Sequence, residues 1–600
     1  MMKLSDYVLQ RIAEQGVKHI FLVPGGGAMH LNDSLGRRTD IAYVANLHEQ
    51  AAAIAAEAYA RVTGNLGVCM VTTGPGGTNA ITGLIGAWLD STPCLFISGQ
   101  VKCADLKTGT QLRQLGFQEI DIVTIVQSVT KYAVTITDPN SIARHLDKAF
   151  YLAKSGRPGP VWIDIPLDVQ AAMIDPSTLQ RYKPEQPTAT KTDLHELARK
   201  TLQLLSQSER PILMAGNGIR TAKAIEQFQR LIDVLQIPVQ TTWLGLDFIT
   251  DDDPLFAGRP GVIAPRGANF ALQNSDFFLS IGTRIDMFLS GYAHQNFARA
   301  ARKVICDIDE AEIKKLKMNI EIPVVADVRD FIQALLDVAP EFKKSDCKEW
   351  FNRIAQWKSR YPLTAPVDSK NQQKISAYTF SSMLSDEIPE DALIVPGSSG
   401  FACEIFLLML KIKKGQRCFH NHATGAMGFA LPATIGACFA ANKKTVISVD
   451  GDGGFQLNIQ ELATIATHHL PIKFFIINNN GYASIRASQN GYFAGNKVAC
   501  DTDSGLKLPD VLRIAEAYGI RSEKIDQSGD VRAQIRRILA SKDPVVCEVE
   551  VIPDEPRVPR LSSTHRKDGL LVSKPLEDLF PFLDRDEFAD NMLIPMLVDE

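Results

Sequence analysis

The feature that most constrains this chain is a series of short apolar runs, bounded by glycine or proline, that alternate with helical patterns. Examples are HIFLV before PGGG, LGVCMVTT before GPGG, DFFLSIG, and TVISV before GDGG. Strands that are apolar throughout are typical of parallel sheets whose two faces are both covered by helices. The pattern therefore predicts an α/β fold.

Two polar, proline-bearing stretches, at about 175–193 and 343–374, interrupt this pattern. A chain of 600 residues is also about three to four times the commonest domain size. We expect three doubly wound parallel-sheet domains, at 1–178, 190–342 and 370–552. The remaining segment, 553–600, is too short and too rich in proline and charge for a core of its own, so we expect a tail that packs over the third domain and its active site.

The charge balance excludes some partners. The chain has 64 basic and 68 acidic residues, a formal charge of -4, and no run of Lys and Arg. A protein that binds nucleic acid usually carries a basic patch, so we expect no nucleic-acid partner. No apolar stretch approaches the roughly 18 residues of a membrane helix, and the N-terminus lacks a signal-peptide pattern, so we expect a soluble cytoplasmic protein without a membrane partner.

The most specific motif lies in the third domain. Gly451, Asp452 and Gly453 follow one apolar run, and Asn478 and Asn479 follow the next, with 24 residues between Gly453 and Asn478. Ends of neighbouring parallel strands meet at one edge of a sheet, where such folds bind ligands. A carboxylate and an amide oxygen there suit Mg²⁺ shared with a phosphate-bearing ligand. Taken singly, each motif is equally typical of a turn.

This spacing resembles the signature of the thiamine diphosphate enzymes, GDG followed by NN. The resemblance implies thiamine diphosphate and Mg²⁺ as cofactors, with the metal held by Asp452, Asn479 and the backbone carbonyl of Gly481. It also implies that Met427 supports the bent shape of the cofactor. The cofactor-binding residues that it implies are Pro75, Asn79, Gly397, Ser398, Ser399, Met427, Gly451, Asp452, Gly453, Gly454, Asn479, Gly481 and Tyr482.

A second motif lies in the first domain, where HEQAAAIAAEAYARVTG predicts a helix with Glu49 at its start. A lone Glu there is more often a surface residue that complements the helix dipole. The resemblance implies instead that Glu49 hydrogen-bonds the pyrimidine ring of the cofactor and promotes removal of the thiazolium C2 proton. That role requires the protonated carboxyl to be favoured by desolvation.

Within this family the chain is most similar to the acetolactate synthase branch, over essentially its whole length. The motifs that carry this likeness include TTGPGGTNAITGL, SGQV, FQEIDIV and GAMGFALPA. The resemblance implies that Phe117 and Gln118 face the reacting carbons and that amides around Gly26 stabilise alkoxide charge. Related decarboxylases carry an acidic residue where this chain has Ile485, so we expect decarboxylation of a 2-oxo acid, pyruvate, followed by ligation of the two-carbon unit to a carbonyl acceptor.

This chain differs from the acetolactate synthase branch at a residue that binds the acceptor substrate. The branch motif GxRFDDR is represented by GTRIDMF, so Phe288 replaces the Arg that holds the acceptor's carboxylate. One alternative is therefore acetyl transfer to a keto-sugar nucleotide in polysaccharide synthesis, and another is that Arg486 has taken over the clamp. A non-ligating decarboxylase or oxidase and a degenerate paralogue are further alternatives, although the intact Glu49, Asp452 and Asn479 argue against the last.

The resemblance extends to a flavin and to assembly. FAD would be a structural ligand of the central domain, and the positions that match its pocket are Arg157, Gly216, Gly218, Arg284 and Asp307. In the family the two halves of one active site come from different subunits. We therefore expect a homodimer or a homotetramer, and we leave a regulatory subunit open.

Overall fold

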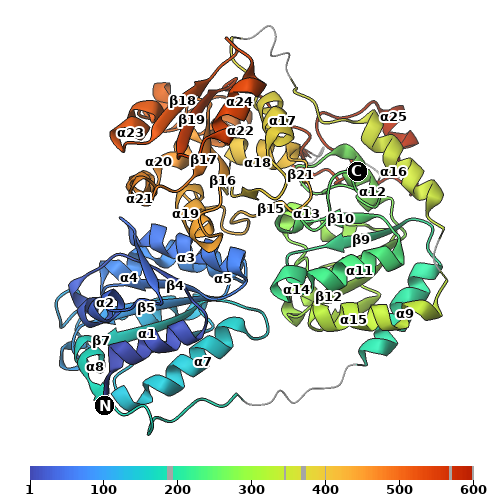
Figure 1. Ribbon diagram of the computed structural model, residues 1–600. Coiled ribbons are helices and arrows are strands. Elements are labelled where there is room, and N and C mark those ends of the chain that lie inside the picture. The colour runs from blue at the N-terminus through green and yellow to red at the C-terminus, as the bar shows by residue number, and fades with distance from the viewer. Residues whose placement is uncertain (185–192, 344–345, 367–372, 399, 566–570, 598–600) are drawn as a thin grey trace. The chain divides into compact units, whose positions relative to one another are not determined.

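The computed structural model describes residues 1–184, 193–343, 346–366, 373–398, 400–565 and 571–597. Its contacts divide the chain into two compact units. Unit 1 comprises 1–188, 392–403 and 420–553, and unit 2 comprises 189–391, 404–419 and 554–600. Each unit is described separately below (Figure 1).

The first sheet of unit 1 is entirely parallel in its pairings. In spatial order its strands are β3 (Ala42–Ala45), β2 (His19–Leu22), β4 (Gly67–Val71), β5 (Cys94–Gln100), β7 (Val161–Pro166) and β6 (Tyr132–Thr135). The helices around it are α1 (Leu4–Glu14), α2 (Met29–Gly36), α3 (Glu49–Thr63), α4 (Pro75–Asn79), α5 (Ile81–Leu89), α6 (Ile122–Val126), α7 (Ile142–Lys154) and α8 (Leu167–Ala171).

Alternate residues of these strands bury opposite faces of the sheet. Ile20, Met70 and Ile97 pack with α1 and α7 in one core, whereas Phe21 and Phe96 are fully buried outside that core. Both faces are therefore apolar, as the uninterrupted runs predicted. Helices α1 and α7 cover one face and α3 and α5 the other (Figure 1).

The second sheet of unit 1 has the same parallel pairing. Its strands follow the order β15 (Arg417–Cys418), β14 (Leu393–Ile394), β16 (Val446–Gly451), β17 (Ile472–Asn478), β19 (Val545–Glu550) and β18 (Arg521–Ile525). Its helices are α19 (Ala430–Ala440), α20 (Asp452–Gln456), α21 (Leu462–His468), α22 (Ala483–Tyr492), α23 (Val511–Ala517) and α24 (Val531–Ala540). Helix α18 (Gly400–Met409) begins in unit 1 and ends in unit 2.

Helices α3 and α19 join the two sheets of unit 1. A Cβ atom on Gly436 of α19 would lie 2.0 Å from the backbone oxygen of Ala55 on α3, so the two helix backbones touch directly. The Ala-rich sequence of α3 permits this approach, because no larger side chain keeps the helices apart.

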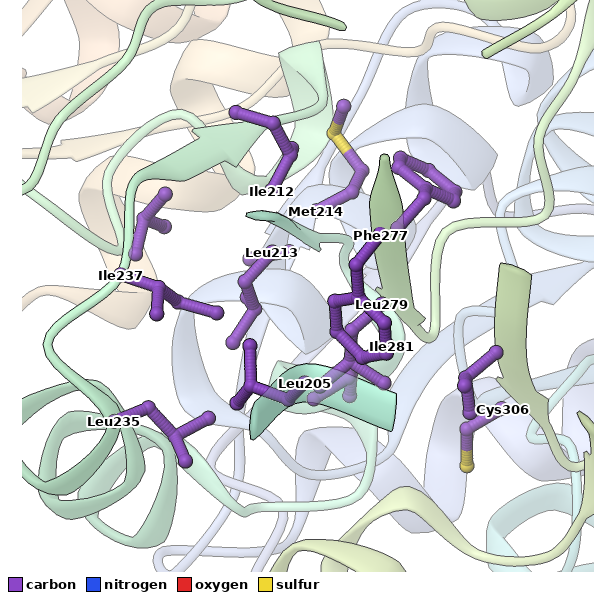
Figure 2. Close-up of a cluster of buried hydrophobic side chains, with 14 of the residues drawn as sticks. Leu205, Ile212, Leu213, Met214, Leu235, Ile237, Phe277, Leu279, Ile281 and Cys306 are labelled. Carbon is purple, nitrogen blue, oxygen red and sulfur yellow. The ribbon is translucent and has the colours of Figure 1, made fainter. Parts of the chain in front are cut away.

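The sheet of unit 2 is also parallel. Its strands are β10 (Val239–Thr241), β9 (Pro211–Ala215), β11 (Phe277–Ile281), β12 (Arg302–Asp307) and β13 (Ile322–Val325) in spatial order. Leu213 and Leu279 lie in its core with Leu205 and Leu235 from the flanking helices (Figure 2). Those helices are α9 (Leu194–Ser206), α10 (Gly218–Thr221), α11 (Ile225–Leu235), α12 (Arg266–Gln273), α13 (Met287–Ser290), α14 (Glu310–Lys314), α15 (Val328–Val338) and α16 (Lys348–Arg360). Helix α17 (Ala377–Glu387) is also assigned to unit 2 but contributes none of its described residues to this core. Three parallel sheets flanked by helices confirm the predicted fold class.

Part of the C-terminal tail packs on the central sheet. Leu576 and Phe588 of the tail complete the core of the central sheet, and Asn269 donates to the Leu576 carbonyl at 2.6 Å. The tail contains β20 (Ser563–His565), β21 (Leu571–Ser573) and α25 (Arg585–Asp590). The start of the tail contacts the expected third domain, since Glu555 accepts from Ser376 Oγ at 2.5 Å and Tyr378 Oη donates to the Val558 carbonyl at 2.8 Å. The expectation of a tail over the third domain and its active site therefore stays a prediction. The four domain boundaries stay a prediction.

Candidate active site

Asp452 lies at the carboxyl end of β16, where the strand passes directly into α20. Its Oδ1 accepts a hydrogen bond of 2.9 Å from the Gly453 amide, and its Oδ2 accepts one of 2.8 Å from the Gly481 amide. The residue is 3% exposed. Burial raises the pKa of this carboxyl to about 6, and hydrogen bonds from Gly481 and Gly453 and the charge of Arg486 oppose that rise. Each oxygen of the Asp452 carboxylate thus accepts one of these hydrogen bonds and keeps a lone pair with which it can bind a cation.

Asn479 follows the end of the neighbouring strand β17. Its side-chain Oδ1 is buried, and no hydrogen-bond donor reaches it among the described residues. Leaving a buried acceptor unsatisfied costs about 1 to 3 kcal/mol, so such an atom indicates a ligand. An amide oxygen beside a carboxylate suits Mg²⁺, and the residues present therefore fit the predicted metal.

Gly481 completes the predicted ligand set through its backbone. Its φ is +109°, and a Cβ there would lie 2.5 Å from the Cys500 carbonyl, so only glycine is accommodated. Its carbonyl accepts from the Ala483 amide at 3.0 Å and keeps a second lone pair. In the part of the chain that the structure describes, no group of three or more His, Cys, Asp or Glu side chains could hold a metal. Mg²⁺ does not require one, because phosphate and water oxygens usually complete its shell.

The predicted diphosphate loop lies beside this metal loop in unit 1. A Cβ on Gly397 would lie 2.4 Å from Oδ1 of Asp450, and one on Gly454 would lie 2.7 Å from the same atom. Asp450 thus fills the space that two glycines leave, and burial raises its pKa to about 7. Ser398 Oγ accepts from the Asn421 amide at 2.9 Å. Ser399 lies outside the described residues.

Ser484 is a polar residue that the sequence did not single out. Its Oγ is buried without a hydrogen-bond partner among the described residues, and it lies 3.8 Å from the position of a Cβ on Gly400. Gly400 begins α18, and the amides at a helix N-terminus favour anions. This second unsatisfied atom supports a phosphate ligand between the two loops.

Three other predicted cofactor residues line the same part of unit 1. The ring of Tyr482 covers Gly453, where a Cβ would lie 2.3 Å from the ring. Met427 is half-buried, and the next residue, Gly428, accepts a hydrogen bond from Asn458 Nδ2 at 2.9 Å. Gly451 is half-buried at the end of β16.

Glu49 lies at the start of α3, as predicted from sequence. Its Oε2 accepts a hydrogen bond of 3.0 Å from Asn79 at the end of α4. Asn79 and Pro75, the first residue of α4, are exposed, and Glu49 is half-buried. Two separate motifs are therefore brought together at the carboxyl edge of the first sheet.

Gln118 and Phe117 lie on a loop at this edge. Phe117 is 85% exposed, and Gln118 has a left-handed φ of +62°. A Cβ on Gly74 would lie 2.4 Å from the Gln118 carbonyl, so the loop packs directly on the TTGPGG turn. Gly26 is exposed in the PGGG turn, whose Gly27 amide donates to Thr72 Oγ1 at 3.1 Å. These turns therefore form one exposed surface.

A buried polar network supports this surface from below. Oδ1 of Asp164 accepts from Ser98 Oγ at 2.5 Å, and its Oδ2 accepts from Thr135 at 3.0 Å and Gln100 at 3.2 Å. Gln100 in turn accepts from Thr73 Oγ1 at 2.8 Å and donates to the Ile120 carbonyl at 2.9 Å. Burial raises the pKa of Asp164 to about 7. The network holds the chain directly after the Phe117–Gln118 loop, through Ile120, and the TTGPGG turn on which the loop packs, through Thr73. Sequence inspection did not find it.

Arg486 does not form the free acceptor clamp considered above. It is 2% exposed, and its guanidinium donates to the carbonyls of Asn479, Asn480 and Pro553. A guanidinium held by three backbone carbonyls of its own chain is committed to the metal loop.

The predicted flavin residues belong to both units. Arg157 lies in unit 1 and donates to Ser91 Oγ at 2.9 Å. The other four lie at the carboxyl edge of the central sheet in unit 2. A Cβ on Gly216 would lie 2.3 Å from the Gly282 carbonyl, and one on Gly218 would lie 2.6 Å from Gly282 Cα.

The remaining two flavin residues have partners within the protein. Arg284 pairs with Glu312 at 3.3 Å, and Asp307 accepts from the Asp309 amide at 2.9 Å. The Gly282 backbone therefore lies directly against both glycines, so the turns after β9 and β11 are packed together at this edge. FAD stays a prediction. Phe288, in the same unit, packs on Trp243 with ring centroids 4.4 Å apart.

Comparison with family models gives matches in all three blocks. Residues 2–125 match the thiamine pyrophosphate enzyme N-terminal TPP binding domain, 198–335 the central domain, and 399–549 the C-terminal TPP binding domain. Both TPP binding domains thus fall on the sheets that carry Glu49 and Asp452.

Curated relatives match over nearly the whole chain. Acetolactate synthase 1, chloroplastic, from Zea mays is 33% identical over 574 residues, 94% of this chain and 87% of its own length. The acetolactate synthase large subunit of Cyanidium caldarium is 31% identical over 92% of this chain and 94% of its own. Acetolactate synthase from Arthrospira platensis is 32% identical over 94% and 96%. Separately, every helix within the described ranges is too short or too polar to span a bilayer.

Proposed function

Since this chain belongs to the thiamine pyrophosphate enzymes, in their acetolactate synthase-like branch, we propose that it decarboxylates pyruvate and ligates the two-carbon unit to a carbonyl acceptor. The family resemblance stated from sequence is thereby confirmed. The observation that carries the proposal is the unsatisfied Oδ1 of Asn479 beside the Asp452 carboxylate.

Thiamine diphosphate and Mg²⁺ are the cofactors of this proposal. Asp452, Asn479 and the Gly481 carbonyl would hold the metal. Gly397, Ser398 and Ser484 would hold the diphosphate, and the amides at the start of α18 would add favourable dipoles. When bound, thiamine diphosphate supplies the carbon nucleophile and takes up the electron pair released by loss of CO₂.

Glu49 is the proton-holding residue in this proposal. Its carboxyl would hold the proton at the pyrimidine ring of the cofactor, and the hydrogen bond from Asn79 fixes the orientation of this carboxyl. Pre-orienting a proton-transfer group lowers the barrier, because the enzyme does not reorganise during the step.

The residues around the substrate bind, orient and exclude water. Backbone amides near Gly26 donate to the substrate oxygen as negative charge develops on it, and Gln118 orients the acceptor carbonyl. Ile485 offers no proton, so the two-carbon unit persists until an acceptor carbonyl arrives. Ligation is therefore favoured over release of acetaldehyde.

The exposed apolar side chains of unit 1 support a homo-oligomer. Phe117 and other large apolar side chains of unit 1 are exposed, among them Leu47 at 55% and Tyr492 at 64%. Apolar side chains around catalytic residues indicate an interface that completes the site. We propose a homodimer, open to pairing into a tetramer, in which Glu49 of one protomer serves the metal site of its partner. One relative is named a large subunit, so a regulatory subunit belongs to the same proposal.

The names of the relatives favour a second pyruvate as the acceptor. The keto-sugar nucleotide acceptor and the non-ligating alternatives are not favoured by them. A structural FAD and a cytoplasmic location stay predictions, and no step of this mechanism involves FAD.

The direct test is incubation of the purified chain with pyruvate, Mg²⁺ and thiamine diphosphate, followed by mass analysis. We expect acetolactate that carries two pyruvate-derived units and depends on both cofactors. Acetaldehyde or acetate as the sole product would contradict ligation, and the absence of any product with any cofactor would contradict the proposal as a whole.

A further inference from the structure

Arg486 is a buried cation that donates hydrogen bonds to three backbone carbonyls. It lies in the first turns of α22 and is 2% exposed. Its Nη2 donates to Asn479 O at 2.8 Å and Pro553 O at 3.0 Å, and its Nη1 donates to Asn480 O at 3.0 Å. Burying a guanidinium is costly unless its donors are satisfied, so these bonds fix its position.

Two of the three acceptors belong to the loop that carries the proposed metal ligands. Each carbonyl lies in the plane of the peptide bond to the next residue. Fixing the Asn479 carbonyl therefore fixes the Asn479–Asn480 peptide, and fixing the Asn480 carbonyl fixes the Asn480–Gly481 peptide. Asn480 has a left-handed φ of +62° and Gly481 a φ of +109°. Asn and Gly adopt such conformations more readily than other residues, so the turn is compatible with its sequence but depends on surrounding groups for a single orientation.

The other side of the loop is fixed independently. The Gly481 amide donates to Asp452 Oδ2 at 2.8 Å, and the Tyr482 amide donates to the Cys500 carbonyl at 2.9 Å. Arg486 adds a restraint on the carbonyls of Asn479 and Asn480. Held from both sides, the loop keeps Asn479 Oδ1 buried and directed at no protein donor among the described residues.

We propose that Arg486 is a positioning residue for the metal loop, and that its hydrogen bonds to the Asn479 and Asn480 carbonyls fix the loop in the metal-binding conformation before a cation arrives. This inference rests on the proposed function, because the cation is the Mg²⁺ of the cofactor. Arg486 touches neither the cation nor the substrate in this role. The planar guanidinium donates from two nitrogens to two successive carbonyls, and the single ammonium nitrogen of a Lys cannot reproduce this geometry.

The test compares three variants of the full chain: Arg486→Met, Arg486→Lys and, as a matched control, Arg513→Met. The Arg513 side chain is 86% exposed on α23, in the same unit. Calorimetry with Mg²⁺ at saturating thiamine diphosphate measures metal affinity. Losing a residue that orients metal ligands typically weakens metal binding about 10- to 100-fold, and we expect this for Arg486→Met. Arg486→Lys should lie between Arg486→Met and the wild type, and Arg513→Met should match the wild type.

A second readout needs no cofactor. Hydrogen exchange of the metal-free protein reports the Gly481 amide, which is bonded to Asp452. We expect faster exchange there in Arg486→Met, with unchanged exchange in β17 and an unchanged thermal midpoint. A general loss of stability would instead raise exchange throughout the sheet.

The outcomes separate this inference from the proposed function. A wild-type chain that binds neither Mg²⁺ nor thiamine diphosphate overturns the proposed function, and the exchange experiment then decides the role of Arg486 in the loop. Wild-type affinity and wild-type exchange at Gly481 in Arg486→Met overturn the inference. If Arg486→Met does not fold, Arg486→Lys decides: weaker Mg²⁺ binding at a native thermal midpoint supports the inference, and unchanged binding overturns it.

Discussion

The backbone amide of Gly481 donates a hydrogen bond of 2.8 Å to the carboxylate of Asp452. This bond joins the loops that follow β16 and β17, so the two halves of the metal site are already connected in the metal-free chain. In our proposal the Asp452 carboxylate has two functions: it holds the loop after β17 and it binds the metal. Mutation can separate the two.

Asp452→Asn tests this double function. An amide keeps one oxygen for the Gly481 bond but removes the negative charge. We expect Mg²⁺-dependent binding of thiamine diphosphate to weaken by roughly 100-fold, the upper range for loss of one charge-assisted contact. Calorimetry measures this, with the exposed Asp503→Asn as control. Unchanged affinity in Asp452→Asn would remove this residue from the metal site.

Mixing two inactive variants tests assembly. Glu49→Gln should bind cofactor but exchange its C2 proton slowly, and Asp452→Ala should fail to bind it. If one site uses Glu49 of one protomer and Asp452 of its partner, each mixed dimer has one intact site. Random reassociation should then restore about one quarter of wild-type activity. The control is each variant reassociated alone, and no recovery in verified heterodimers would place both residues of a site on one chain.

Asp164 predicts a specific pH dependence. Its folded pKa of about 7 lies above its ordinary value, so folding favours the protonated form. The stability that this group contributes is complete below about pH 4 and is lost as pH rises to about 7. An Asn at this position does not titrate. From pH 5 to pH 8 the unfolding free energy of Asp164→Asn should therefore rise by about 3 kcal/mol relative to wild type.

Scanning calorimetry of both proteins across this pH range measures the difference. Asp503→Asn should show no such trend, because that residue is exposed. A constant offset between Asp164→Asn and wild type at every pH would contradict the elevated pKa.

Phe288 tests the choice of acceptor. Its ring packs on Trp243, and an Arg side chain at the same position can stack on that indole and keep its charge directed outward. We expect Phe288→Arg to increase acetolactate formation from pyruvate alone by about 10-fold or more, because a charge-assisted bond to the acceptor carboxylate is gained. Met287→Arg, at an exposed neighbouring position, is the matched control. Equal rates in the two variants would show that Phe288 does not face the acceptor.

Sequence inspection was most successful where chemistry is local. The apolar runs predicted the parallel sheets, because a strand buried on both faces has no polar alternation, as Ile20 and Phe21 on opposite faces of β2 demonstrate. Asp452 and Asn479 were found for a similar reason, since each directly follows a strand.

Residues that act through distant partners were missed. Asp164 reaches the Phe117–Gln118 loop only through Gln100, and Asp450 fills the space left by Gly397, 53 positions earlier in the chain. No spacing rule links such residues, because folding alone brings them together. The central contacts of the tail were missed for the same reason, as its proline and charge content gave no sign that Leu576 and Phe588 belong to the central core.

The contact between Gly436 and the Ala55 backbone has a consequence for the history of such chains. Even a methyl group at position 436 would collide with α3, so the helix that begins with Glu49 and the helix that follows Met427 can change only together. A chimera that takes its first block from one relative and its third from another would inherit two helices never selected to touch. Recombination between relatives is thus expected to preserve α3 and α19 as a pair, whatever happens to the block between them.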